Sequence, residues 1–525
     1  MTPASFLRVL DPLTSSPLPS GRPPRPTLYL GDVVLVRGLP GRGQDAPLEL
    51  LTKVAAERGI EVVLESPIAT RKPTRLTAAM RTDRLLAPIA ERHAEALDPV
   101  WVTTARLVGG DQPIDAWPIL QAARRADPEV ARGLALDHLL SLAAPDYQGM
   151  PYYVSMPYYV SMPYYVSMPY YVSMPAGAPP AAQYTQPGSG GRSPVAVVLP
   201  DPALRRRSLK RHPVVVVPDT ALGAHSWFTD PTFATDVVHA CGLRLGLNGD
   251  VPAALPTPAR NPLDGSVPVD AGHATFIAGI LRQLAPEARV QVIPLLDDTG
   301  RMPEGALIQV LALLLVRHLD ALNQGTTDDL VDVLSLSLGY YHEDPDDALE
   351  DAPLRALLDQ FGRAGVAVVC SAGNQATTDP LYPAAFAPVV DPTAGSRFDA
   401  GVVPLTCVAA LNPDRTTVAY FSNAGPWVSA HRAGAAVVST VPQDLDGELQ
   451  ASAGLDDGAL RRATIDPENF AGGFAIWSGT SFAGPVLAAE LAARLADDPS
   501  LSECDRDTQV RRAWAALEQT VGWRP

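Results

Sequence analysis

Between residues 212 and 525, short runs of apolar residues alternate with segments that have the spacing of helices. The runs are continuous, not interrupted at every second position, so each strand is expected to be covered on both faces. Such strands separated by helices predict an α/β domain with a doubly wound, mostly parallel sheet. In sheets of this kind the functional side chains gather at the carboxyl ends of the strands. The runs are Val214–Val217, Val290–Pro294, Val331–Leu336, Val366–Ser371 and Val403–Ala410.

The chain before this domain begins with two regions of different character. Residues 1–26 are rich in proline and serine, and we expect them to be disordered. Residues 27–145 have a mixed α/β pattern with no catalytic constellation. This pattern indicates a small packed accessory domain, or a prosegment that helps the following domain to fold or blocks its cleft. Strand-like runs lie at Thr27–Val36, Ile60–Leu64 and Val100–Val108, and helical periodicity lies around Leu48–Arg58, Arg81–Ala96 and Trp117–Ala126.

Residues 146–211 are predicted to be a linker. Met-Pro-Tyr-Tyr-Val-Ser occurs four times in tandem from Met150 to Ser173, and a proline at every sixth position excludes a helix and interrupts a central strand. The repeat is interpreted as an extended spacer, with a docking strip as the alternative, so a protein partner could bind through residues 27–175. The basic cluster from Arg205 to Arg211 is either a solvated loop or a processing site.

Composition limits the partners and the compartment. The chain has 41 Lys and Arg against 57 Asp and Glu, and its net charge of −16 argues against nucleic acid or an anionic membrane as a partner. No signal-peptide core is recognised, and no stretch reaches the roughly 18 apolar residues of a membrane span. We therefore expect a cytoplasmic protein. The four cysteines are far apart, lack metal-ligand spacing and suit free thiols in a reducing compartment; they are Cys241, Cys370, Cys407 and Cys504.

Three segments of the C-terminal domain carry the residue types of one catalytic constellation. Asp219 follows four valines and a proline, at a place where a buried carboxylate is costly unless it is paired. His273 opens the segment His-Ala-Thr-Phe-Ile-Ala-Gly, and Ser481 stands between a Gly-Thr turn and an apolar helix. Each residue alone has an ordinary structural explanation. The chain order Asp, His, Ser is nevertheless one of three unrelated orders for the same catalytic geometry.

The chemistry explains why these residue types belong together. A serine hydroxyl is a weak nucleophile at neutral pH and needs a base within hydrogen-bonding reach. Histidine suits this role because its pKa lies near the working pH, and an aspartate can orient the ring and stabilise the imidazolium. The start of the helix at Ser481 favours a developing oxyanion. Asn374, at the end of another apolar run, can donate its side-chain amide to that oxyanion.

Seven stretches in this order resemble the subtilisin-like serine peptidases, over about residues 212–500. The resemblance implies a subtilisin-like fold and hydrolysis of polypeptide substrates through an acyl-enzyme on Ser481. It makes His273 the general base, Asp219 the orienting carboxylate and Asn374 the oxyanion donor. It also implies that Ser337, Leu338 and Gly339 bind substrate by strand addition. The stretches are Val217–Thr220, His273–Gly279, Ser337–Gly339, Ser371–Asn374, Tyr382–Ala384, Phe421–Gly425 and Gly479–Pro485.

The chain departs from the family pattern in several places. Ala221 and Ala274 replace glycines, and Phe276 replaces a second histidine, but none of these changes removes a catalytic group. An insertion at about 443–473 is a candidate flap near the cleft. Family members often bind calcium; no ligand pattern supports it here, so calcium stays open and no other cofactor or metal is expected. The alternative functions are an inactive scaffold that binds partners, and a peptidase restricted to one partner substrate.

Overall fold

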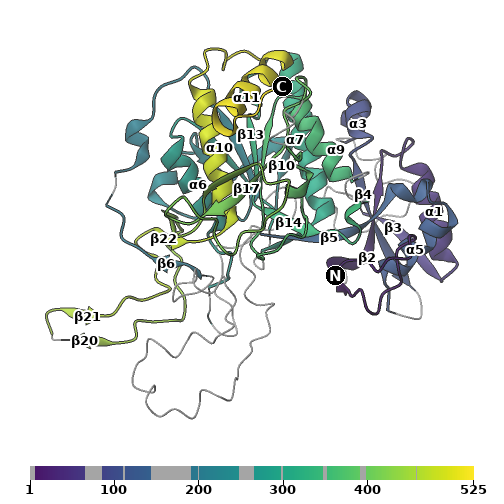
Figure 1. Cartoon of the computed structure of the whole chain (residues 1–525), viewed down its shortest axis with the longest axis horizontal. Helices are drawn as coiled ribbons and strands as arrows, with labels where there is room; N and C mark the ends of the chain where they lie inside the picture. Colours follow the sequence, from purple (N-terminus) through teal and green to yellow (C-terminus); the bar gives the residue numbers. More distant parts are fainter. Residues whose placement is uncertain are drawn as a thin grey trace, which may run out of the picture.

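The computed structural model describes residues 6–65, 86–109, 113–142, 191–198, 200–247, 265, 267–296, 300–346, 352–390, 398–456 and 458–525. The tandem repeat Met150–Ser173 lies outside the described residues. Two sheets dominate the described part: a parallel sheet in the C-terminal domain and an antiparallel sheet centred on the N-terminal domain (Figure 1).

The parallel sheet has seven strands in the order β18-β17-β15-β13-β7-β11-β8, and every neighbouring pair is parallel. The five apolar runs of the sequence correspond to the five central strands, because residues buried on both faces leave a continuous apolar signal. The two edge strands carry no such signal. The bounds are β7 Val214–Asp219, β8 Ala234–Thr235, β11 Arg289–Pro294, β13 Val333–Leu336, β15 Ala367–Ser371, β17 Thr406–Leu411 and β18 Ala430–Ala433.

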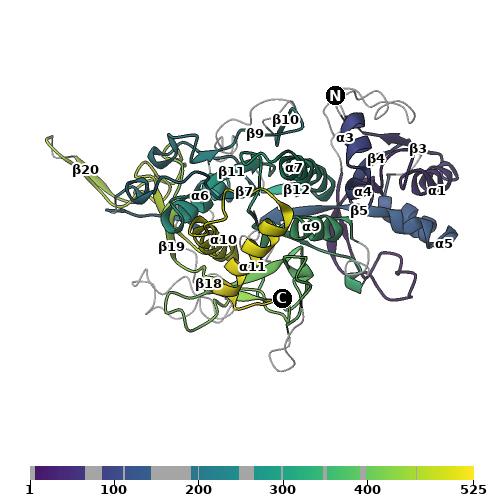
Figure 2. The ribbon, with the colours of Figure 1, turned by 90° about the horizontal axis from the view of Figure 1, so that it is seen from above.

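Helices cover both faces of this sheet, which confirms the doubly wound α/β class (Figure 2). Helices α7 (Glu304–Gln324) and α9 (Pro353–Arg363) share one apolar core with the sheet. The other face is covered by α6 (His273–Leu284), α10 (Thr480–Ala496) and α11 (Arg506–Val521). Helix α7 alone among the described residues is long and apolar enough to span a membrane, but 72% of its apolar window is buried. It is therefore placed as a core helix.

The N-terminal domain is an antiparallel sheet with helices on one face. The strand order is β16-β14-β5-β2-β4-β3, with β1 also on β2 and β12 also on β5. Helices α1 and α5 pack against one face in a core of their own, and the other face continues into the core around α7. The bounds are β1 Leu7–Leu10, β2 Thr27–Arg37, α1 Asp45–Ala56, β3 Ile60–Leu64, α3 Leu86–Arg92, α4 Ala94–Leu97, β4 Val102–Gly109, α5 Ala116–Ala126, η1 Val130–Gly133 and β5 Leu134–Leu142.

Two features of this domain differ from the expectation. The disorder expected for residues 1–26 does not hold for Leu7–Leu10, which pair with Thr27–Leu30 as strand β1. Strand β5, which has no counterpart among the expected strands, crosses from this domain to the C-terminal one. There it pairs with β14 (Leu338–Tyr341) on one side and β12 (Arg301–Pro303) on the other. The two domains thus share one continuous sheet.

The segment after the repeat is anchored to the C-terminal domain. Ser193–Pro194 form β6, the edge of a small sheet with β22 (Phe474–Trp477) and β19 (Val437–Thr440). The basic cluster, expected to be a solvated loop or a processing site, is tied down by ion pairs. Arg207 binds Glu287, and the buried Arg211 binds Asp332. The remaining elements are η4 Pro202–Arg205, η5 Ser226–Phe228, β9 Val238–Ala240, β10 Leu243–Leu245, β16 Leu381–Tyr382 and η6 Ala384–Phe386.

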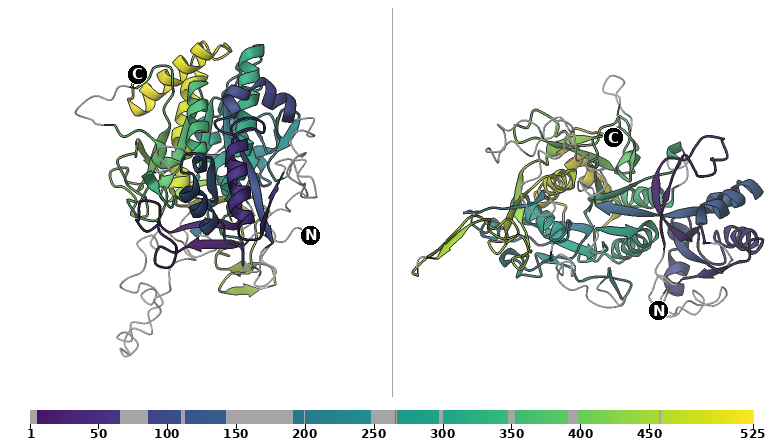
Figure 3. Two further views of the ribbon diagram at one scale, coloured as in Figure 1. Left: turned by 90° about the vertical axis from the view of Figure 1, so that its right-hand side faces the viewer. Right: turned by 90° about the horizontal axis from the view of Figure 1, so that it is seen from below.

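The insertion at about 443–473 contains the hairpin of β20 (Gly454–Asp456) and β21 (Arg461–Ala463). All six strand residues are exposed. The hairpin projects from the body of the molecule on the side away from the N-terminal domain (Figures 1 and 3). Its strands therefore do not form the flap near the cleft that the sequence suggested. The base of the insertion is packed, since Phe470 is fully buried in the core.

Candidate active site

Asp219 and His273 meet at the carboxyl edge of the parallel sheet. Asp219 is the last residue of β7, and His273 is the first residue of α6. Nδ1 of His273 lies 2.9 Å from each carboxylate oxygen of Asp219, and both side chains are fully buried. The backbone N–H of Thr220 donates to Oδ1 of Asp219 at 2.7 Å. This carboxylate is therefore paired on two sides, as a buried charge requires.

A glycine fixes the approach of the chain to His273. Gly272 has φ of 80°, in the left-handed region that glycine adopts without steric cost. A Cβ atom at this position would also lie 2.6 Å from Cδ of Pro442. The turn therefore depends on Gly272, and it sets the start of α6 so that the imidazole faces the end of β7.

Ser481 lies at the start of α10, as the sequence predicted, beside an aromatic cluster. The side chain of Ser481 is fully buried, and its carbonyl oxygen accepts a hydrogen bond from Oγ of Ser337 at 3.0 Å. The ring of the next residue, Phe482, is 5.4 Å from the ring of His273. Trp477 meets His273 edge-on at 5.7 Å. The first turns of α6 and α10 are thus in direct contact around the imidazole.

Asn374 is held against the turn that leads to Ser481. Its Oδ1 accepts a hydrogen bond from the backbone N–H of Thr480 at 2.7 Å, and Oγ1 of Thr480 accepts one from Gly373 at 3.0 Å. Because its oxygen is engaged, Asn374 keeps the two N–H donors of Nδ2 for another acceptor. This is the orientation that an oxyanion donor needs.

Three polar atoms of this region are buried and have no hydrogen-bond partner within the described residues. They are Nε2 of His273, Nδ2 of Asn374 and Oγ of Ser481. Other buried polar atoms of the described residues also lack a partner, but these three belong to the residues that the sequence predicted to act together. The structure thus joins Asp219 to His273 and Asn374 to the serine turn, but it shows no hydrogen bond between Ser481 and His273.

The residues predicted to bind substrate are covered by the N-terminal domain. Leu338 lies opposite Leu142 of β5, and Gly339 lies opposite Ser141. On its other side, Ser141 lies opposite Arg301 of β12. Strand β5 is therefore the central strand of three, in the place that an added peptide strand would take. Ser337 has a different position, because its hydroxyl supports the carbonyl of Ser481.

Arg192 was not predicted as part of this site. Its fully buried guanidinium donates to the carbonyl oxygens of Pro268, Val269 and Ala271, just before His273, at 2.6–2.9 Å. It also lies 4.7 Å from the ring centroid of Trp477. Burial lowers the pKa of Arg192 to about 10, so the group stays cationic at neutral pH. No sequence pattern pointed to Arg192, because it follows a Gly-Ser-rich stretch.

The departures from the family pattern are accommodated by packing and by a backbone hydrogen bond. Phe276 is fully buried and contacts the ring of Phe482 at 4.4 Å and that of Trp477 at 5.6 Å. The backbone N–H of Ala274 donates to Oγ1 of Thr220 at 3.1 Å. Within the described residues, the one group of His and acidic side chains that could hold a metal lies elsewhere, at the domain interface.

The comparisons with known proteins agree with this architecture. Residues 267–520 match the model of the Subtilase family, so His273, Asn374 and Ser481 lie inside the match and Asp219 lies before it. No curated protein sequence matches the chain.

Several solved structures are distantly similar. Fervidolysin from Fervidobacterium pennivorans, described as a keratinolytic enzyme related to subtilisin, shares 17% identity at a TM-score of 0.44, over 89% of this chain and 55% of that one. The prenylagaramide maturation protease PagA shares 18% identity at a TM-score of 0.34, over 57% of this chain and 80% of that one. A cold adapted subtilisin-like serine proteinase shares 16% at 0.34, also over 57% and 80%.

Proposed function

Since this chain belongs to the subtilase family, whose members are typically serine endopeptidases, we propose that it hydrolyses polypeptides through an acyl-enzyme on Ser481. The observation that carries the proposal is the pairing of His273 with Asp219, which leaves Nε2 of the imidazole buried and unpartnered. A histidine with one nitrogen on a carboxylate and the other open is arranged to accept a proton.

The proposed reaction follows from the contacts of each group. Oγ of Ser481 attacks the carbonyl carbon of the peptide bond and passes its proton to Nε2 of His273. Asp219 keeps the proton on Nδ1 and stabilises the imidazolium that forms. Nδ2 of Asn374 donates to the oxyanion. His273 then gives its proton to the leaving amine, and a water molecule, activated by the same imidazole, hydrolyses the acyl-enzyme.

We also propose that the full-length chain is latent. Strand β5 pairs with Leu338 and Gly339, the residues that the substrate would need. Because a backbone ladder can be occupied by only one strand at a time, a peptide must displace Leu139–Leu142 before it can bind. Residues 27–145 would then act as a prosegment, the second of the two interpretations that the sequence allowed.

A cytoplasmic location is proposed as well. It is supported by the four cysteines, which are free in the structure although Cys370 and Cys407 lie opposite each other on β15 and β17. Free thiols suit a reducing compartment. Detection of the native chain only in an exported fraction would contradict this location.

An active-site serine probe tests the catalytic proposal. A fluorophosphonate should label the wild-type chain, slowly because the chain is latent, and should not label Ser481→Ala. The matched control is Ser478→Ala, which changes a neighbouring serine of the same segment and should still be labelled. To separate latency from inactivity, the labelling is repeated on Ser141→Pro, which removes a backbone N–H from β5 and weakens its pairing. Two outcomes would refute the assignment of Ser481. One is labelling of Ser481→Ala equal to that of the wild-type chain, and the other is no labelling of both the wild-type chain and Ser141→Pro.

A further inference from the structure

A cluster of buried ionisable side chains lies where the two domains meet, away from the candidate active site. His138 belongs to β5, whereas His342 and Glu343 directly follow β14. Their side chains are 1%, 8% and 1% exposed. One donor atom from each residue lies within 4.8 Å of the donors of the other two. The peptidase mechanism uses none of the three.

The contacts of His138 have the pattern of a metal-binding histidine. Nε2 lies 2.7 Å from Oε2 of Glu343, and Nδ1 lies 2.6 Å from Oε2 of Glu304. The hydroxyl of Tyr340 in turn donates to Oε1 of Glu304 at 2.9 Å. Metal-ligating histidines usually donate their second ring nitrogen to a carboxylate that is itself hydrogen-bonded, which fixes the tautomer and the ring orientation. Glu304 and Tyr340 already form that outer support.

His342 completes a set of three donors. Its ring lies 5.0 Å from the ring of His138, and its Nδ1 lies 3.5 Å from the same Oε2 of Glu343 that contacts His138. Its Nδ1 also accepts the backbone N–H of Asp344 at 3.0 Å. Arg124 occupies the other carboxylate oxygen of Glu343 at 3.5 Å. Oε2 of Glu343 therefore faces both imidazoles.

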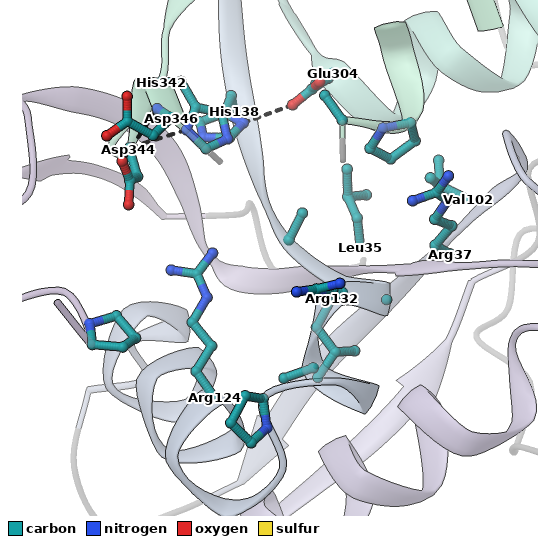
Figure 4. A pocket seen from close by; sticks show the side chains of 18 of the residues that line it. Leu35, Arg37, Val102, Arg124, Arg132, His138, Glu304, His342, Asp344 and Asp346 are labelled. Carbon is teal, nitrogen blue, oxygen red and sulfur yellow. Dashed lines mark hydrogen bonds and ion pairs between the residues drawn. The ribbon is translucent and has the colours of Figure 1, made fainter. Parts of the chain in front are cut away.

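A cavity of about 580 Å³ adjoins the cluster and is lined by both domains. Figure 4 shows His138 and His342 together at one wall, with Glu304 on the far side of the His138 ring and Arg124 across the cavity. The lining also includes Asp346, whose side chain is 71% exposed, so the cavity reaches the surface. It offers an entry path and room for a water molecule as a fourth ligand.

We propose that His138, His342 and Glu343 bind a zinc ion that ties the N-terminal domain to the peptidase domain. Two imidazoles, one carboxylate and a water are a donor set that Zn²⁺ accepts in four-coordinate sites. Ligand bonds of about 2.0–2.1 Å place tetrahedral donors about 3.3 Å apart, and the donor atoms of the three side chains now lie within 4.8 Å of one another. The zinc replaces the proton that His138 now shares with Glu343, and the second charge offsets the buried carboxylates.

The inference does not rest on peptidase activity, so the test uses the full-length Ser481→Ala chain without a histidine tag. After treatment with a chelator, the chain is titrated with zinc sulfate in a calorimeter. One equivalent should bind. His138→Gln, His342→Gln and Glu343→Gln should each weaken binding at least 100-fold, and Glu304→Gln should weaken it roughly 10- to 100-fold. The matched control is His239→Gln, an exposed histidine of β9, which should leave the affinity unchanged.

X-ray absorption at the zinc edge of the loaded Ser481→Ala chain tests the site without altering its ligands. The expected signal is a shell of four nitrogen and oxygen donors at about 2.0–2.1 Å with the scattering of two imidazoles. Absence of stoichiometric binding, a sulfur shell, or equal loss of affinity in His239→Gln would overturn the proposal and leave the cluster as an ion-pair network. Binding that is unchanged in folded His138→Gln would do the same.

Discussion

His273 and His138 are both buried histidines bonded to carboxylates, yet their surroundings differ in one respect. Asp219 engages Nδ1 of His273, and Nε2 has no partner within the described residues. For His138, carboxylates engage both nitrogens. An imidazole that is open on one side can exchange a proton with a third group, whereas one closed on both sides holds its neighbours in place. The comparison thus contrasts the candidate active site with the junction between the domains.

The largest effect on activity should come from removing the imidazole of His273, whose Nε2 has no partner within the described residues. We expect His273→Ala to reduce turnover of a peptide substrate by roughly 10⁴- to 10⁶-fold, because Ser481 loses its base. The denaturation midpoint should fall modestly, because the variant leaves the buried Asp219 with its Thr220 hydrogen bonds alone and removes ring contacts to Trp477 and Phe482. Activity is measured as kcat/KM on a chain whose N-terminal domain has been released by processing or by Ser141→Pro. A large loss of stability with modest loss of turnover would mean that His273 is structural.

Removing the imidazole of His138, which has a carboxylate on each nitrogen, should lower the stability of the fold. Burial by itself lowers the pKa of His138, but the charges and hydrogen bonds of Glu343 and Glu304 outweigh it and raise the pKa to about 10. The cation is therefore present at neutral pH, and His138→Ala leaves two buried carboxylates without it. We expect a loss of about 3–5 kcal/mol in the free energy of unfolding, measured by denaturant in the Ser481→Ala background with a chelator.

The control for this change is His239→Ala, at an exposed position, which should stay within about 0.5 kcal/mol of the parent chain. If His138→Ala is as mild as the control, the contacts of the cluster do not hold the domains together. The latency proposal adds a second readout: His138→Ala in the wild-type background should label faster with the fluorophosphonate, because β5 is released more readily.

Nδ2 of Asn374, another buried atom without a partner in this region, offers a finer test of the candidate active site. Asn374→Ala removes the Nδ2 donor and should reduce kcat by about 10²- to 10³-fold with a smaller effect on KM. It also removes the acceptor of the Thr480 N–H, so Asn374→Asp serves as the comparison. Asp keeps an acceptor oxygen but lacks the donor. Recovery of full activity in Asn374→Asp would show that Asn374 only supports the turn.

The sequence predicted the contact between Asp219 and His273 much better than the junction between the domains. The apolar runs that end at Asp219 and before Asn374 are continuous because their strands are buried on both faces, and side chains at those ends must meet at one edge. The pairing of His273 with Asp219 followed from that edge and is observed. The sequence did not predict that Ser481 and His273 would lack a hydrogen bond to each other, because that depends on side-chain positions and not on the order of the strands.

The junction could not be predicted because its parts are distant in sequence and have no local pattern. The segment Leu134–Leu142 could pack as a strand or a helix, and nothing in it specifies β14 and β12 as partners. His138 and Glu343 look like isolated polar residues until β5 and β14 pair. Strand β1 was missed for the same reason, because Leu7–Leu10 lie in a proline-rich stretch and gain their order from β2.

A third buried histidine extends the comparison to a side chain with backbone partners alone. His318 of α7 donates from Nε2 to the carbonyl of Ala364 at 3.0 Å and accepts the N–H of Val331 at Nδ1, also at 3.0 Å. Burial lowers the pKa of His318 to about 4, below the ordinary value of 6.5. A lowered pKa of a base means that the folded chain resists protonation. Its stabilising contribution is therefore complete above pH 6.5 and is lost as the pH falls toward 4.

We expect this histidine to make the smallest of the four contributions, on the order of 1–2 kcal/mol of unfolding free energy lost between pH 7 and pH 5. Denaturant unfolding of the Ser481→Ala chain at both pH values, compared with His318→Gln, measures it. Gln can both donate and accept but does not titrate, so its profile should be flatter over this range. His138 works in the opposite direction, because a raised pKa makes its stabilising contribution complete below pH 6.5 and smaller as the pH rises above that value. Equal slopes for His318→Gln and the parent would mean that His318 does not control this loss.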